Sequence, residues 1–262
     1  MKLTFLGTGT SCGVPLPTCP CAVCNSSDPR DNRLRCSAMI ETDDKQQILV
    51  DCGPDFRLQA IRSGIRHIDA LLLTHNHFDH CFGIDDLRAY CYEKPLPTYA
   101  DAFLTSKLKE RHDYIFVHRY PGTPQMNLVT VNPGETFYVG QTPVTAIRVF
   151  HGKAPILAFR IGNLAYITDC TEIPDDQWQY LEGIDTLVLD ALRWKEHPTH
   201  YSVEQALAIV ARLQPQQTWF THMSHDIGLH DEANQRIREL LPQFGITGQV
   251  QLAYDTLEIN TK

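Results

Sequence analysis

The segment from residue 75 to 80 constrains this chain more than any other feature, because it reads His-Asn-His-Phe-Asp-His directly after an apolar run at 70–74. That run predicts a buried β-strand, so three imidazoles and a carboxylate stand where a rigid element ends. Neutral imidazole and carboxylate are ligands that Zn²⁺, Mn²⁺ and Fe²⁺ prefer. An extended turn that leads into a helix can direct such side chains at two adjacent ions. The segment therefore predicts a metal centre; a polar loop that happens to be rich in histidine is the alternative.

Two short patterns each occur twice in the sequence. LLLTHNH at 71–77 is similar to WFTHMSH at 219–225, and ILVDCG at 48–53 is similar to YITDCT at 166–171. In every case an apolar strand ends in Asp or in Thr-His. Strand ends are rigid positions for functional side chains. Two related halves that face each other across one cleft would explain the repetition, and chance similarity between short apolar strands is the alternative.

The pattern of apolar residues predicts alternating strands and helices in a single domain over 1–262, since no linker or low-complexity stretch divides the chain. Strands are expected at 2–6, 38–42, 47–50, 70–74, 144–150, 156–161, 165–168 and 218–221, with an extended end at 249–259. Helices are expected at 56–63, 82–91, 175–181, 203–213 and 231–241.

Composition excludes some classes of protein. The net charge of −8 and the pI near 5.8 disfavour binding to a long nucleic acid. The sequence has no apolar run of 18 residues, so no membrane span is expected. The first residues do not resemble a signal peptide, and nine cysteines suit a reducing compartment better than a disulfide framework. We therefore expect a cytoplasmic protein in which some cysteines bind metal.

The string THNHFDH at 74–80 resembles the T-H-x-H-x-D-H signature of the metallo-β-lactamase superfamily. The resemblance implies an α/β fold, specifically a four-layer αββα sandwich. It also implies two divalent active-site ions, and imidazole and carboxylate ligands would accept Mn²⁺ or Zn²⁺. The later ligands of the superfamily match three strand ends of this chain. One ion would be held by His75, His77 and His151, the other by Asp79, His80 and His222, with Asp169 bridging both.

A second motif narrows the resemblance. LGTGTSCGVP at 6–15 and the C-x-C-x-x-C run at 19–24 resemble the cyclic-phosphate phosphodiesterases of the bacterial carbon–phosphorus lyase pathway. That resemblance implies a separate structural Zn²⁺ in this loop. Three thiolates and an imidazole make a closed tetrahedral site; here they would come from Cys19, Cys21, Cys24 and His225. The other six cysteines stand singly and are expected to be small buried hydrophobes.

The same resemblance implies a general acid before the helix at 203–213. His200 is expected to protonate the leaving group, and Asp79 is counted as catalytic as well as a ligand. His197 is expected to be solvated. Asp51 and Asp190 also end apolar strands, and either could hold a metal-binding histidine through its second ring nitrogen.

These residues predict a dinuclear-metal site, and the resemblance implies a hydrolase that cleaves a small phosphodiester by attack of a metal-bridging hydroxide. The resemblance implies a cyclic ribosyl phosphate as one such substrate. Two alternatives stay open, a hydrolase of carboxylic esters, lactones or thioesters that uses the same metals, and a non-catalytic relative from quinone-cofactor biosynthesis. The expected partners are a small phosphodiester and, as an open alternative, a second copy of the chain in a homodimer.

Overall fold

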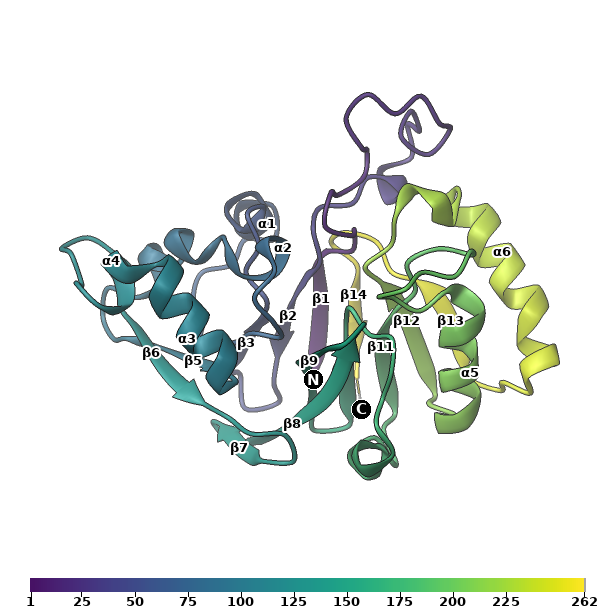
Figure 1. Cartoon of the computed structure of the whole chain (residues 1–262). Coiled ribbons are helices and arrows are strands. Elements are labelled where there is room, and N and C mark those ends of the chain that lie inside the picture. Colours follow the sequence, from purple (N-terminus) through teal and green to yellow (C-terminus); the bar gives the residue numbers. More distant parts are fainter. Residues whose placement is uncertain (262) are drawn as a thin grey trace.

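Two seven-stranded β-sheets pack face to face in the computed structural model, which describes residues 1–261 (Figure 1). The first sheet has, in spatial order, β14 (Glu258–Asn260), β1 (Lys2–Gly7), β2 (Ser37–Glu41), β3 (Gln47–Val50), β4 (Ala70–Leu72), β5 (Leu96–Ala100) and β6 (Met126–Thr130). The second has β13 (Gln249–Leu252), β12 (Gln217–Thr221), β11 (Thr186–Asp190), β10 (Leu164–Ile167), β9 (Ala154–Ile161), β8 (Thr142–His151) and β7 (Thr136–Val139).

Helices cover the outer face of each sheet (Figure 1). The first sheet carries α1 (Phe56–Arg62), α2 (Phe78–Cys81), α3 (Ala102–Arg111) and α4 (Asp113–Phe116). The second carries α5 (Val203–Leu213) and α6 (His230–Leu240). Helix α5 begins at a capping box, in which the Ser202 side chain accepts from the Gln205 backbone N–H and the Gln205 side chain accepts from Ser202. The arrangement is the four-layer αββα sandwich that the family resemblance implied.

The central strands are continuous apolar runs because both of their faces are buried. In β3, Ile48 and Val50 pack between the sheets, whereas Leu49 packs under the helices of its own side. In β11, Val188 lies between the sheets, and its neighbours on either side face the outer core with α5 and α6. Successive residues of a strand point to opposite faces, so a covered sheet requires apolar residues at every position.

Strand direction brings the functional loops together. Strands β3 to β6 run parallel in the first sheet, and β10 to β13 run parallel in the second. The carboxyl ends of parallel strands meet at one edge of a sheet, where ligand-binding loops gather. Asp51, Asp169 and His222 stand just beyond three of these ends, with φ of 59°, 54° and 58°. This left-handed backbone is costly for residues other than glycine.

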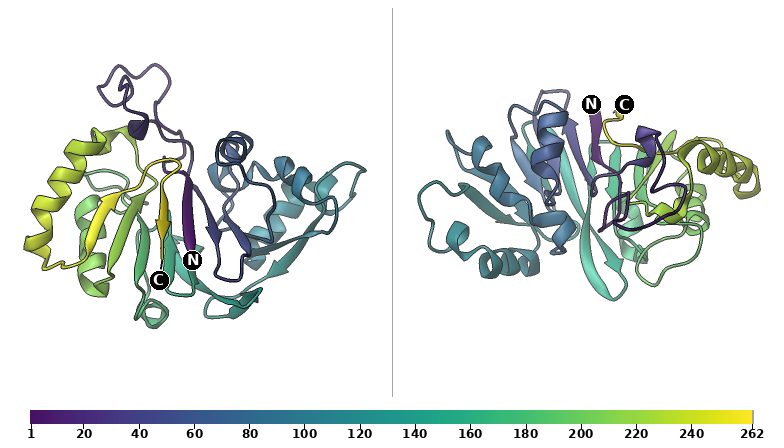
Figure 2. Two further views of the ribbon diagram at one scale, coloured as in Figure 1. Left: turned by 180° about the vertical axis from the view of Figure 1, so that it is seen from behind. Right: turned by 90° about the horizontal axis from the view of Figure 1, so that it is seen from above.

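A long loop at 8–35 projects beyond the sandwich on the side of α6 (Figure 2). Its two ends are tied to the body of the protein. The Thr10 backbone N–H donates to Met223 O at 3.0 Å. The buried Arg33 guanidinium donates to Thr8 Oγ1 at 2.9 Å and to Ala253 O at 2.7 Å. The loop is therefore held against the turn that follows β12.

Several predicted elements differ in the structure. The helix expected at 82–91 is instead α2, which begins at Phe78, followed by a 3₁₀ helix at Ile84–Tyr90. The helix expected at 175–181 is also 3₁₀, at Asp175–Tyr180. The extended end at 249–259 is two strands in different sheets, β13 and β14. Further 3₁₀ turns lie at Pro29–Asp31, His225–Ile227 and Leu241–Phe244.

Within the described chain, every helix is too short or too polar to cross a bilayer. The single domain over 1–262 stays a prediction, and its last residue, Lys262, lies outside the described residues.

Candidate metal centre

Four predicted ligands form a buried cluster where the two sheets meet. Ligand atoms of Asp79, His80, Asp169 and His222 all lie within 4.8 Å of one another. Nε2 of His80 is 3.3 Å from Asp169 Oδ1, and Nε2 of His222 is 3.0 Å from the same oxygen. Helix α2 supplies Asp79 and His80 from the first sheet's side, whereas Asp169 and His222 follow strands of the second sheet.

A second group shares Asp169 with the first. Ligand atoms of His75, His77 and Asp169 also lie within 4.8 Å of one another, and His77 is exposed. The ring centroid of His151 is 5.1 Å from that of His77. A third group of the same size contains His151, Asp169 and His200. Asp169 is thus common to all three groups, as expected of a bridging residue, and the structure brings all seven predicted active-site ligands together.

Hydrogen bonds fix two of the imidazole rings from behind. His80 Nδ1 donates to Asp51 Oδ2 at 2.7 Å, and Asp51 also accepts from the backbone and side chain of Thr74. His151 Nδ1 donates to the Thr199 carbonyl at 2.7 Å. In the neutral rings these bonds place the hydrogen on Nδ1, so Nε2 carries the lone pair that an ion would bind. Asp51 therefore has the supporting role that its strand-end position predicted.

The charges within the cluster are strongly coupled. Burial opposes the charged form of His80, yet the Asp169 and Asp79 carboxylates raise its pKa well above the usual value. Burial likewise opposes charge on His222, and Asp169 again raises its pKa. Burial also disfavours the ionised form of Asp169, but His222 and His80 hold the pKa of that carboxyl well below normal. In contrast, burial lowers the pKa of His75. Without metal, the carboxylates therefore favour the protonated form of His80 and His222.

The cluster suits divalent ions. Within residues 1–261, the Nε2 atoms of His75 and His80 are buried and make no hydrogen bond. Buried polar atoms without a partner are rare in folded proteins. Both lie beside Asp169 oxygens, so each could point its lone pair at an ion held there. Imidazole nitrogens with carboxylate oxygens match the donor set that Zn²⁺ and Mn²⁺ accept.

His200 lies at the edge of this cluster. Its ring is buried, and its centroid is 5.0 Å from that of His222 at an interplanar angle of 20°. Asp190 Oδ2 is 3.6 Å from His200 Nδ1, too far for a hydrogen bond but close enough for electrostatic attraction. Asp190 therefore lies beside His200 rather than behind a predicted ligand. The structure thus places His200 beside the metal cluster, with a ligand atom within 4.8 Å of those of His151 and Asp169.

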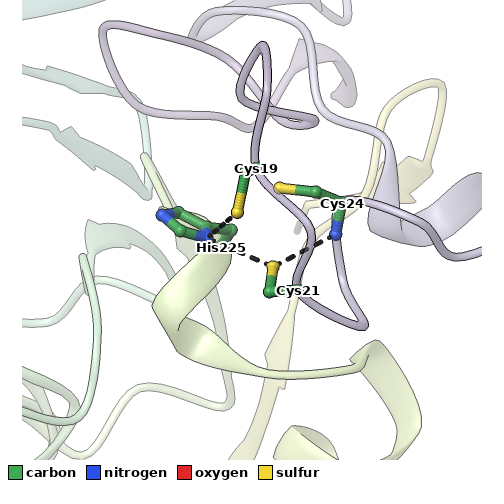
Figure 3. Close-up of side chains that lie close together, drawn as sticks. All are labelled: Cys19, Cys21, Cys24 and His225. Atoms are coloured by element: carbon green, nitrogen blue, oxygen red, sulfur yellow. Dashed lines mark hydrogen bonds between the residues drawn. The ribbon is translucent and has the colours of Figure 1, made fainter.

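The three cysteines of the loop and His225 also converge (Figure 3). His225 Nδ1 is 3.5 Å from Cys19 Sγ and 3.3 Å from Cys21 Sγ. Hydrogen bonds from the Cys24 backbone N–H and from His225 lower the pKa of the Cys21 thiol to about 6. Thiolate is the form that binds metal, so this group suits a tetrahedral Zn²⁺.

Of the other six cysteines, five are buried as predicted. Cys12 is the exception, because it is exposed in the loop at 8–35, where the polypeptide has no core to enter.

The sequence did not single out Thr199 and Thr168, which support the site. Thr199 acts through its carbonyl oxygen, which every residue type has, so no sequence signal could have found it. Thr168 donates from Oγ1 to Asp169 Oδ1 at 2.9 Å. Its position before Asp169 parallels Thr74 before His75 and Thr221 before His222, and this repetition was available in the sequence.

The αββα sandwich, with a His/Asp cluster able to bind metal at its edge, defines a class of metal-dependent hydrolases. The sequence model of the beta-lactamase superfamily domain matches residues 46–223, and the chain belongs to that family. It is therefore a member of the metallo-β-lactamase superfamily.

Three relatives show how the chain relates to known proteins. A new diphosphatase from the PhnP family, known from a crystal structure, has 39% sequence identity to this chain. The match covers 100% of this chain and 98% of the diphosphatase chain, with a TM-score of 0.88. An octanoyltransferase of Porphyromonas gingivalis is 40% identical over 98% of this chain, but the match spans only 51% of that protein. A ribonuclease Z of Thermosynechococcus vestitus is 31% identical over 62% of this chain and 36% of its own length. The chain thus spans about half or less of these two relatives.

Proposed function

We propose that this protein is a dinuclear-metal hydrolase that cleaves a small phosphodiester, with His200 as the general acid. The observation that supports this proposal most is that three groups of possible metal ligands share Asp169. His200 belongs to one of these groups. In this assignment His75, His77 and His151 bind one ion, and Asp79, His80 and His222 bind the other. Asp169 contacts both. A cyclic ribosyl phosphate is one substrate of this class.

The roles of the protein's own residues follow from their contacts. Two ions bound here would lower the pKa of water and offset charge on phosphoryl oxygens. Asp51 and the Thr199 carbonyl hold the His80 and His151 rings in their binding orientation. His200 stands beside the cluster with Nδ1 toward Asp190, so Nε2 is the atom available to protonate a leaving alkoxide.

The relatives support chemistry at phosphorus. One is named a diphosphatase and covers the whole of this chain, and another is named a ribonuclease. The octanoyltransferase name belongs to a protein about half of which lies outside the match, so it does not favour acyl transfer here.

The cysteine group, which we propose holds a structural Zn²⁺, lies in the loop at 8–35 and at the turn after β12.

The diphosphatase relative favours a second candidate, the hydrolysis of a diphosphate bond. The leaving group would then be a phosphate, which departs without being protonated first. A general acid would matter little for that substrate. The dependence of the rate on His200 therefore distinguishes an ester with a poor leaving group from a diphosphate.

The test uses one variant and two substrates. In His200→Ala, we expect hydrolysis of an alkyl or cyclic diester to slow by about 10²-fold or more, because an alkoxide needs a proton to leave. Hydrolysis of bis(p-nitrophenyl) phosphate should change little, since nitrophenolate is a stable anion. His118→Ala, which removes an exposed imidazole, serves as the control.

Metal content is measured on each variant. An equal loss of rate on both substrates would remove His200 as the acid. A loss of metal from His200→Ala would show that His200 is a metal ligand instead. Its ligand atom lies within 4.8 Å of those of His151 and Asp169.

A further inference from the structure

Four neighbouring imidazole rings form a row that runs outward from the metal cluster. The centroids of His80 and His222 are 5.4 Å apart, those of His222 and His200 are 5.0 Å apart, and those of His200 and His197 are 5.1 Å apart. The exposed fraction of the residues increases along this row. It is 0% for His80, 1% for His222 and 8% for His200, and His197 is half-buried. His197 is therefore the outermost ring, directly beside the residue proposed as general acid.

The tautomer of His197 follows from its contacts. The Thr199 backbone N–H donates to His197 Nδ1 at 3.3 Å, and Thr199 Oγ1 lies 3.1 Å from the same atom. A backbone N–H can only donate, so Nδ1 is the acceptor and the ring hydrogen is on Nε2. Burial and the neighbouring His200 lower the pKa of His197, which also favours the neutral ring. His197 thus offers a fixed Nε2–H donor.

This tautomer argues against a proton relay through His197. A relay takes up a proton at one ring nitrogen and releases one from the other. Nδ1 of His197 already faces a backbone N–H, so a proton there would meet a donor. The same residue, Thr199, holds His151 through its carbonyl, so the position of the 197–200 loop is fixed relative to the cluster.

We propose that His197 Nε2–H donates a hydrogen bond to a second oxygen of the leaving alcohol, next to the ester oxygen that His200 protonates. The substrates favoured would then be phosphodiesters of a polyol, such as a sugar or a glycol, over those of a simple alcohol. This inference rests on the proposed function. The ring centroids of His197 and His200 are 5.1 Å apart, so the two rings can contact neighbouring oxygens of one leaving group.

Two symmetric diesters test the inference, because either ester bond then releases the same alcohol. Bis(2-hydroxyethyl) phosphate has a second oxygen in its leaving group, and dipropyl phosphate has a methyl group in that place. We expect the wild-type protein to prefer the hydroxylated diester in kcat/KM by roughly three- to tenfold, the worth of one hydrogen bond. In His197→Leu the ratio should approach one, mainly through a higher KM for the hydroxylated diester.

Two further variants complete the design. His197→Gln retains an N–H donor and should keep part of the preference for the hydroxylated diester. This variant also tests the inference if His197→Leu folds poorly. His67→Leu removes an exposed histidine that pairs with Asp69 and should behave as wild type. A preference unchanged in both His197→Leu and His197→Gln would overturn the inference while leaving the proposed function intact.

The alternatives give different results. An equal fall in kcat on both diesters in His197→Leu and in His197→Gln would indicate proton transfer through His197 and contradict the fixed donor. If the wild-type protein hydrolyses neither diester, the proposed function fails and this inference fails with it.

Discussion

At the scale of single residues, the metal centre depends on the second nitrogen of each imidazole as much as on the first. His80 is held by a buried carboxylate, and His151 is held by a backbone carbonyl. Ring nitrogens that are hydrogen-bonded from behind lose little freedom when an ion binds. Asp51 is the one of these partners that a side-chain substitution can remove.

Replacing Asp51 by Asn should weaken metal binding by about 10- to 100-fold. An amide cannot supply the negative charge that now faces His80 Nδ1 at 2.7 Å. The measurement is a metal titration of the stripped protein. Asp43→Asn, at a carboxylate whose side chain is 87% exposed, is the matched control and should bind metal normally. Equal affinities in the two variants would contradict the supporting role of Asp51.

The sequence was informative about the site residues only where they lie close together in the chain. His75, His77, Asp79 and His80 were recognisable because all four lie within six consecutive positions. His151, Asp169 and His222 are far apart in sequence. The repeated strand-end patterns indicated Asp169 and His222, but only the resemblance to a known family connected all three. The Thr199 carbonyl could not be predicted, because a backbone contact depends on where the loop folds and not on its side chain.

At the scale of elements, the turn after β12 (Gln217–Thr221) serves both metal groups. His222 belongs to the buried cluster, and His225 belongs to the cysteine group three residues later. Met223, between them, exchanges backbone hydrogen bonds with the loop at 8–35. The loop has few apolar residues of its own to bury, so we expect a bound Zn²⁺ to stabilise it.

Cys21→Ser should lower the melting temperature and remove one Zn²⁺ per chain, because binding of a structural metal contributes directly to folding. Hydrolysis by the folded fraction should continue, since Cys21 is not part of the Asp169 cluster. Thermal unfolding and elemental analysis are compared with Cys12→Ser, a change at an exposed cysteine of the same loop. A Cys21→Ser protein that kept its full zinc content and stability would contradict the structural site.

Element types were less predictable where helical turns are short. The apolar spacing at 82–91 suggested one α-helix, but Gly83 separates two shorter helical segments. A Cβ at Gly83 would lie 1.9 Å from the Gly53 carbonyl oxygen, so close contact with another loop sets this geometry. The extended stretch at 249–259 was recognised, but the change of sheet between β13 and β14 depends on the tertiary structure.

At the scale of the whole molecule, the sandwich brings together charges that are far apart in sequence. Asp79 and His80 come from the side of the first sheet, whereas Asp169 and His222 come from the second. Without metal, the raised pKa values of His80 and His222 favour the protonated form of both rings. This contribution to stability is fully present below the unfolded histidine pKa of about 6.5 and is lost as pH rises through the folded values.

Metal binding at pH 7 should therefore release protons, about two per chain, because only neutral imidazole binds an ion. The two protons come from His80 and His222, since burial already keeps His75 neutral. The release is measured by calorimetry in buffers of different ionisation enthalpy, with the cysteine group already filled. Apparent affinity should fall as pH is lowered. Binding without proton release would contradict the charge state assigned to the metal-free cluster.

The most direct test of the central claim is kcat/KM for the metal-loaded wild-type protein on a matched panel. The panel contains a cyclic ribosyl phosphate, a simple alkyl phosphodiester, a diphosphate diester, a lactone, a thioester and a β-lactam. We predict that the phosphodiesters have the highest kcat/KM values. A lactone or thioester hydrolysed far faster than every phosphodiester would contradict the phosphodiesterase proposal, while leaving the fold and the metal cluster unchanged.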